Sequence, residues 1–209
     1  HSDNNSNLFI GAGAGEVNAP LGGDGISNAF IGFQAGKANT TGSNNIAIGP
    51  QALTTNITGS NNTAIGRSAL KVFTGGATLA IGDASLTSLT TGTGNLAIGG
   101  SSLQSVTTGS NNIAIGALAL YSNTGDRNTG IGINALKFTV TGIRNTAIGF
   151  NIGAGVSGQS FNDNTLIGAF VGQVLTTGGN NTVIGSLAGL KLTSGARNLL
   201  LGFRVGDNL

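Results

Sequence analysis

The chain has 209 residues, of which only 8% are charged and 38 are glycine, with a formal net charge of +2. An apolar content of 39% excludes a disordered chain, two prolines exclude collagen, and nine scattered Lys and Arg residues argue against nucleic-acid binding. The absence of cysteine excludes a disulfide framework. No apolar run reaches the roughly eighteen residues of a membrane span, so no direct membrane insertion is expected.

The first predicted strand lies within residues 8–15, LFIGAGAG. Glycines after a strand are also found in dinucleotide-binding loops, but Gly15 stands one position early for that motif and no helical pattern follows. Residues 21–27, LGGDGIS, faintly resemble a calcium-binding repeat, but a single copy without the aspartate spacing favours a turn. Neither segment therefore predicts a cofactor or metal site.

One phrase then recurs to the end of the chain: residues 41–53 read TGSNNIAIGPQAL and residues 58–70 read TGSNNTAIGRSAL. The "NxAIG" part is typical of a short strand and the "TTGSN" part of a turn. A period near seventeen is too short for helical repeats, so it predicts one coil of an all-β parallel β-solenoid or β-roll. Residues 1–209 form a single repeat domain of about twelve coils on this pattern. The repeat glycines are Gly11, Gly32, Gly49, Gly66, Gly82, Gly99, Gly116, Gly132, Gly149, Gly168, Gly185 and Gly202.

The strand positions alternate between two apolar columns. We expect Ile46, Ile48 and their counterparts to face the interior of the coil, because successive strand residues face opposite sides. The residue between them is apolar in every copy, so a second covered face is predicted, and with it an obligate homo-oligomer. The small residues expected to face the other subunits are Ala47, Ala64, Ala80, Ala97, Ala114 and Ala147.

An asparagine stands four residues before the repeat glycine in eleven of the twelve copies, and Thr78 is the exception. Such an asparagine can bond the local backbone and the asparagine of the next coil, which predicts a structural ladder. The glycine seven residues before the repeat glycine is expected to supply a positive φ. The ladder residues are Asn28, Asn45, Asn62, Asn95, Asn112, Asn128, Asn145, Asn164, Asn181 and Asn198.

The ionisable residues do not predict an enzyme. The only histidine is His1, and the acidic residues are isolated in sequence, whereas a glycosidase needs two carboxylates within about 5–10 Å. Arg127, Arg144 and Arg197 share the place before the asparagine column and are expected to project from one edge of the rod. They are either solvated charges or a binding edge for an acidic saccharide.

The repeat is interrupted at two places, where the linkers 16–27 and 153–163 carry extra residues. Insertions in a solenoid form loops on its surface, so a local ligand site is most naturally placed there.

The motifs "NNIAIG", "NNTAIG" and "GNLAIG" resemble the head repeats of YadA-type trimeric autotransporter adhesins. They also resemble the repeat shafts of bacterial and phage fibres that end in an endosialidase-type intramolecular chaperone. The resemblance covers essentially the whole chain and implies a left-handed β-roll, a homotrimer, an extracellular, cell-surface or virion tail-fibre location, and attachment to a cell-surface glycan or protein. The seventeen-residue coil is longer than the YadA-type repeat, which is near fourteen residues.

Three functions follow from these patterns. The preferred one is a non-enzymatic adhesive or receptor-binding fibre segment, and the alternative is a passive spacer that holds a tip elsewhere. A remote alternative is ice binding by the regular column of threonines beside the turn glycine, which a thermal-hysteresis measurement would detect.

Overall fold

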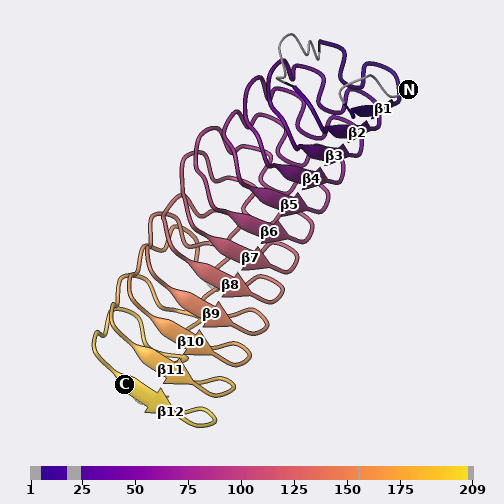
Figure 1. Ribbon diagram of the computed structural model, residues 1–209. Coiled ribbons are helices and arrows are strands. Elements are labelled where there is room, and N and C mark those ends of the chain that lie inside the picture. Colours follow the sequence, from indigo (N-terminus) through magenta and orange to yellow (C-terminus); the bar gives the residue numbers. More distant parts are fainter. Residues whose placement is uncertain (1–5, 18–24, 155, 207–209) are drawn as a thin grey trace.

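The computed structural model is a rod in which the chain winds through similar coils along one axis (Figure 1). The structure describes residues 6–17, 25–154 and 156–206. Each coil contributes one strand of three residues, and we number the coils after their strands. The predicted all-β parallel solenoid is therefore confirmed. The strands are β1 (Leu8–Ile10), β2 (Ala29–Ile31), β3 (Ile46–Ile48), β4 (Thr63–Ile65), β5 (Leu79–Ile81), β6 (Leu96–Ile98), β7 (Ile113–Ile115), β8 (Thr129–Ile131), β9 (Thr146–Ile148), β10 (Thr165–Ile167), β11 (Thr182–Ile184) and β12 (Leu199–Leu201).

The strands form one parallel sheet in sequence order, from β1 at one end to β12 at the other. The register of the strands pairs equivalent repeat positions, so that Ala47 lies beside Ala64 and Ile48 beside Ile65. At the usual strand spacing of about 4.8 Å the stack is roughly 55 Å long. The sequence period is therefore converted into straight columns of equivalent side chains along the rod.

The glycine that follows each strand is required by its backbone conformation and by its neighbour. Gly49 has φ 129°, a region that side-chain-bearing residues rarely adopt. A Cβ atom on Gly49 would also lie 2.6 Å from the carbonyl oxygen of Gly66 in the next coil. The strand end can therefore stack closely only when this position has no side chain.

The turn glycine seven residues earlier has a different role from the one expected. Of these glycines in the described residues, only Gly25 has a positive φ, of 67°. The others are needed for close approach: a Cβ on Gly109 would lie 2.7 Å from the carbonyl oxygen of Gly125. The prediction of a positive φ at this column was thus wrong for most coils.

The two faces of the strand are the reverse of our expectation. Ala47 is fully buried, whereas Ile46 and Ile48 are 39% and 37% exposed. The interior is already filled by Ala52 and Leu53, both fully buried, so the strand can place only a small side chain there. The bulky isoleucines face outward instead. The six alanines that we expected to contact other subunits are instead fully buried within the single chain. They are Ala47, Ala64, Ala80, Ala97, Ala114 and Ala147.

The interior keeps a nearly constant volume by matching two positions: the middle strand residue and the residue four places after the repeat glycine. In eleven of the twelve coils a large side chain at one of them accompanies a small one at the other, whereas coil 9 has small residues at both, Ala147 and Gly153. In coil 2, a Cβ on Gly36 would lie 2.5 Å from the ring of Phe30. Small–large pairs are Ala47/Leu53, Ala64/Leu70, Ala80/Leu86, Ala97/Leu103, Ala114/Leu120 and Gly130/Leu136, and large–small pairs are Phe9/Gly15, Phe30/Gly36, Leu166/Gly172, Val183/Gly189 and Leu200/Gly206.

Candidate functional site

The outward face of the sheet carries an uninterrupted apolar column. The last residue of every strand is isoleucine, or leucine in β12, and each one is partly or well exposed. Their exposure reaches 51% at Ile10 and 57% at Leu201, at the two ends. We call this set the outer isoleucine column. It consists of Ile10, Ile31, Ile48, Ile65, Ile81, Ile98, Ile115, Ile131, Ile148, Ile167, Ile184 and Leu201.

The first residue of each strand forms a second column on the same face, made of seven apolar residues and five threonines. Neither column contains a charged side chain. Exposed apolar residues continue beyond the strands: Phe33 and Phe150, which directly follow the repeat glycine, are 53% and 45% exposed. The rings of Phe150 and Phe170 meet edge to face with centroids 5.3 Å apart. Within the strands the outer face is thus a long, uncharged strip, apolar along the whole outer isoleucine column, whereas the position after the repeat glycine holds charged residues in two coils, Arg67 and Asp83.

The asparagine ladder is confirmed atom by atom. The Oδ1 atom of Asn28 accepts the backbone N–H of Asn45 at 2.9 Å, and Asn45 Oδ1 accepts that of Asn62 at 3.0 Å. The Nδ2 atom of Asn45 donates to the carbonyl oxygen of Gly59 at 2.8 Å. One amide therefore ties the strand start to the next turn, and the ladder supports the fold rather than a ligand.

Thr78 interrupts the ladder. Its backbone N–H reaches Asn62 Oδ1 at 3.2 Å, but its own buried Oγ1 atom has no hydrogen-bond partner. Phe161, which replaces the turn glycine within the second interruption, leaves the ladder intact. Its carbonyl oxygen accepts the Nδ2 atom of Asn145 at 2.7 Å.

Arg127, Arg144 and Arg197 all lie exposed at the same repeat position, each with a positive φ of 56–60°. Arg144 is paired with Asp163 of a later coil, through Nε–Oδ1 and Nη2–Oδ2 distances of 2.5 and 2.8 Å. This hydrogen bonding lowers the pKa of Asp163 and raises the pKa of the guanidinium. Since both groups are exposed, solvent screens the pair. The three arginines therefore do not present equal charges to a saccharide.

Two other ion pairs also join adjacent coils: Arg67 with Asp83 at 2.7 Å and Lys37 with Glu16 at 3.3 Å. Because both are largely exposed, they contribute little to stability, about 0–1 kcal/mol each. They do show that opposite charges on neighbouring coils meet in the stacked arrangement.

The threonines beside the turn glycine are mostly exposed, and several bond the neighbouring coil. Thr74 Oγ1 donates to the Thr90 carbonyl at 3.2 Å, and Thr124 Oγ1 to the Val140 carbonyl at 3.0 Å. These bonds match the turn role expected for this column.

Side chains that could bind a metal ion are scattered over the part of the chain that the structure describes. Within it, no three His, Cys, Asp or Glu residues gather as a metal-binding group. The glycines after β1 lie in a turn and not at the start of a helix. His1 and residues 18–24 and 155, which include parts of the calcium-like segment and of both interruptions, lie outside the described residues. The described chain contains no helix that would cross a bilayer.

The sequence did not lead us to expect that the outer isoleucine column would lie on the surface. A three-residue strand with apolar residues at every position does not reveal which side faces the interior. The feature of the sequence that could have shown which strand face is buried is the "AL" pair that follows several of the repeat glycines, as in Ala52–Leu53 and Ala69–Leu70. This pair fills the interior, and one narrow coil has room for only one set of large side chains. Comparison of the chain with protein-family models, curated proteins and solved structures gave no match.

Proposed function

We propose that this chain is a non-enzymatic segment of an extracellular fibre, and that copies assemble through the outer isoleucine column. The single observation that carries the proposal is this continuous apolar strip on one face of a twelve-stranded sheet. Parallel sheets are ordinarily covered on both faces, and long apolar strips on soluble proteins mark interaction surfaces. The prediction of an oligomer is retained, but with isoleucines in place of alanines at the contact.

A second copy is the partner that fits the strip best. The side chains repeat at the strand spacing, so a partner with the same spacing can meet them at every rung. Burying the exposed part of each isoleucine contributes about 1 kcal/mol. Twelve rungs together then offset the roughly 4–15 kcal/mol lost in association. Three copies around one axis agree with the resemblance of "NNIAIG" to trimeric adhesin heads.

Attachment to a cell-surface glycan or protein is the preferred role of the assembled rod. The outward turns and the edge of Arg127 and Arg197 would then remain accessible while the apolar strip is covered. The passive spacer is the second candidate, and it is favoured by the pairing of Arg144 with Asp163, which uses one edge charge within the rod. A glycan array probed with the purified chain separates the two, because the spacer predicts no bound saccharide.

The assembly is tested by placing a charge on the strip. We expect Ile98→Glu, in the middle of the outer isoleucine column, to convert trimers into monomers in sedimentation velocity. A buried carboxylate without a partner is strongly unfavourable, whereas in the monomer this position is partly exposed. The matched control is Ile57→Glu, since Ile57 is 50% exposed but lies in a turn away from the sheet.

The control variant should sediment as the wild-type chain does, and both variants should keep the far-ultraviolet circular dichroism of the parent. A wild-type chain that sediments as a monomer at every concentration would remove the proposed assembly. Equal effects of the two substitutions would show that the strip is not the contact.

A further inference from the structure

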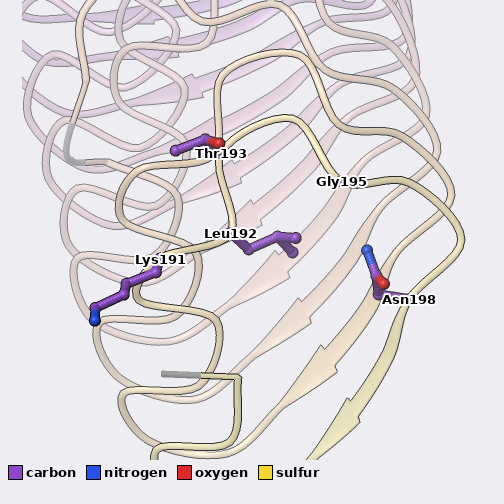
Figure 2. A pocket seen from close by; sticks show the side chains of 5 residues that line it. All are labelled: Lys191, Leu192, Thr193, Gly195 and Asn198. Carbon is purple, nitrogen blue, oxygen red and sulfur yellow. The ribbon is translucent and has the colours of Figure 1, made fainter. Parts of the chain in front are cut away.

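A second interior column runs along the rod at the position seven residues after the repeat glycine. In coils 2–8, 10 and 11 this residue is buried. Figure 2 shows it in coil 11, where the side chain of Leu192 points across the coil toward Asn198. In the lengthened coil 9 the place is taken by Gln159, which pairs with Thr139 of coil 8 in a parallel bridge. We call this set the inner turn column. It consists of Asn39, Asn56, Phe73, Leu89, Val106, Asn123, Thr139, Gln159, Leu175 and Leu192.

In coils 2 and 3 the amide nitrogens of this column are bonded within the protein. Asn39 Nδ2 donates to the carbonyl oxygen of Gly42 at 2.9 Å, and Asn56 Nδ2 donates to that of Gly59 at 2.9 Å. Asn56 Nδ2 also donates to Asn39 Oδ1 at 2.9 Å. In both coils the turn glycine three residues later supplies the acceptor. An asparagine is therefore accommodated here when its turn offers a carbonyl oxygen at that spacing.

Coil 7 does not offer this arrangement. It has 16 residues from Gly116 to Gly132 in place of the usual 17. The turn glycine, Gly125, therefore follows Asn123 by only two residues. Its carbonyl oxygen accepts the ladder residue Asn112 at 2.9 Å but not Asn123. The shortened turn thus removes the acceptor that serves this column in coils 2 and 3.

Five polar atoms of coils 7 to 9 are buried in this column without a partner. Asn123, Thr139 and Gln159 are 0%, 0% and 1% exposed. Among the described residues, no hydrogen-bond partner is found for either amide atom of Asn123 or Gln159, or for Thr139 Oγ1. The backbone beside them is joined: Thr124 N–H donates to the Val140 carbonyl at 2.6 Å, and Val140 N–H to the Gln159 carbonyl at 2.7 Å. The five atoms therefore belong to three successive, directly stacked coils.

The chemistry of these atoms identifies the partner that they require. Two are amide nitrogens that donate, two are amide oxygens that accept, and the hydroxyl of Thr139 does both. A metal ion would bind only the oxygens, and the inner turn column contains no charged side chain. Water donates and accepts, and a buried water makes about three hydrogen bonds to polar groups of this kind. Five buried atoms left unpaired would forfeit a large part of the stability of a typical domain.

We propose that the rod holds structural water molecules in its interior at coils 7 to 9, bound by Asn123, Thr139 and Gln159. Each water bridges side chains of adjacent coils, as the Asn56–Asn39 bond does directly in coils 2 and 3. The waters join coils whose repeat glycines are followed by the next after 16, 17 and 19 residues, so they accommodate turns of different length. The site is independent of the outer isoleucine column, because it lies in the interior of a single chain.

The first test is a crystal structure of the full 209-residue chain at a resolution that shows ordered water. We expect at least one water within hydrogen-bond distance of two of the three side chains, in every copy of the chain. Absence of water from the group, with Asn123, Thr139 and Gln159 either bonded directly to one another or unpaired, would overturn the proposal.

Magnetic relaxation dispersion of water deuterons counts long-lived internal waters in solution. The variant Asn123→Val/Thr139→Val should lose at least one such water relative to the wild type. Val106 is fully buried at the same position in coil 6, so the column accepts valine, and circular dichroism checks that the variant folds. Asn39→Val is the matched control: Asn39 is buried in the same column with its amide bonded within the protein, and its replacement should keep the wild-type count. An equal count in the wild type and the double variant would contradict the site.

Discussion

At the scale of single residues, one amide per coil organises most of the polar interior. Each ladder asparagine from Asn28 to Asn181 satisfies a backbone N–H and a turn carbonyl of the next coil, as Asn112 does with Asn128 and Gly125. A buried polar group without a partner costs about 1–3 kcal/mol, which explains why the asparagine recurs. Thr78 is the one place in the ladder where this rule is broken, with its hydroxyl buried and unpaired.

Restoring the ladder should stabilise the protein. We expect Thr78→Asn to raise the free energy of unfolding by about 1–2 kcal/mol, because the new amide would reach Asn95 and the turn carbonyl beyond it. Urea unfolding followed by circular dichroism measures the change. The reverse substitution in a regular coil, Asn112→Thr, should lower stability by a similar amount. A lower stability of Thr78→Asn would show that the interruption is required by packing.

At the scale of the element, a three-residue strand and its following turn act as one packing unit. In every coil except coil 9, the volume at the middle strand position is compensated four residues after the repeat glycine. Each of those later residues has a positive φ, whether it is leucine, as Leu53 with φ 50°, or glycine, as Gly36 with φ 57°. Leucine is strained in this conformation, so its burial must outweigh a cost of about 1–3 kcal/mol.

This compensation predicts a coupled pair of substitutions. Ala47→Phe alone should destabilise the chain by about 1–3 kcal/mol because the ring overlaps Leu53. Leu53→Gly alone should cost about 2–5 kcal/mol through the cavity that it leaves, less the relieved strain. The double variant reproduces the Phe30/Gly36 pair of coil 2 and should be more stable than the sum of the single changes predicts, by about 1–3 kcal/mol in a urea-unfolding cycle. Additive effects would contradict the compensation.

The period, the strand position, the parallel stacking and the asparagine ladder were all predictable from the sequence. Each of these features depends on a spacing that recurs along the chain, and such a spacing can be read from the sequence without the structure. The direction of Ala47 and Ile48 was not predictable from the strand alone, because both are apolar and alternation fixes only that they differ. The choice depends on Leu53, which lies in a turn and adopts a positive φ that leucine seldom takes.

The arrangement of the three arginines was likewise predictable from the sequence only in part. The repeat position of Arg127, Arg144 and Arg197 predicts a shared edge, and all three are exposed. The pairing of Arg144 depends on Asp163, nineteen residues away, which stands at the same position one coil later. Long-range partners of this kind become visible only when the coil length across the 153–163 interruption is known.

At the scale of the whole molecule, the rod is a stack whose surfaces follow from the repeat. Its sheet face is uncharged along the entire length and carries an unbroken column of isoleucine and leucine, while the Asn-, Thr- and Ser-rich turns are mainly polar. A single hydrophobic interior is too narrow to shelter both sides of the strands. Association of copies through the sheet face is therefore the physical claim on which the proposed fibre depends.

The most direct measurement uses the absence of cysteine from the chain. A single cysteine introduced as Ile98→Cys lies on the outer isoleucine column, and one introduced as Ile57→Cys lies on an exposed turn. Under mild oxidation and denaturing electrophoresis, Ile98→Cys should give a covalent dimer at low protein concentration, while Ile57→Cys stays monomeric. Failure of Ile98→Cys to cross-link, or equal cross-linking of both variants, would contradict assembly through this face.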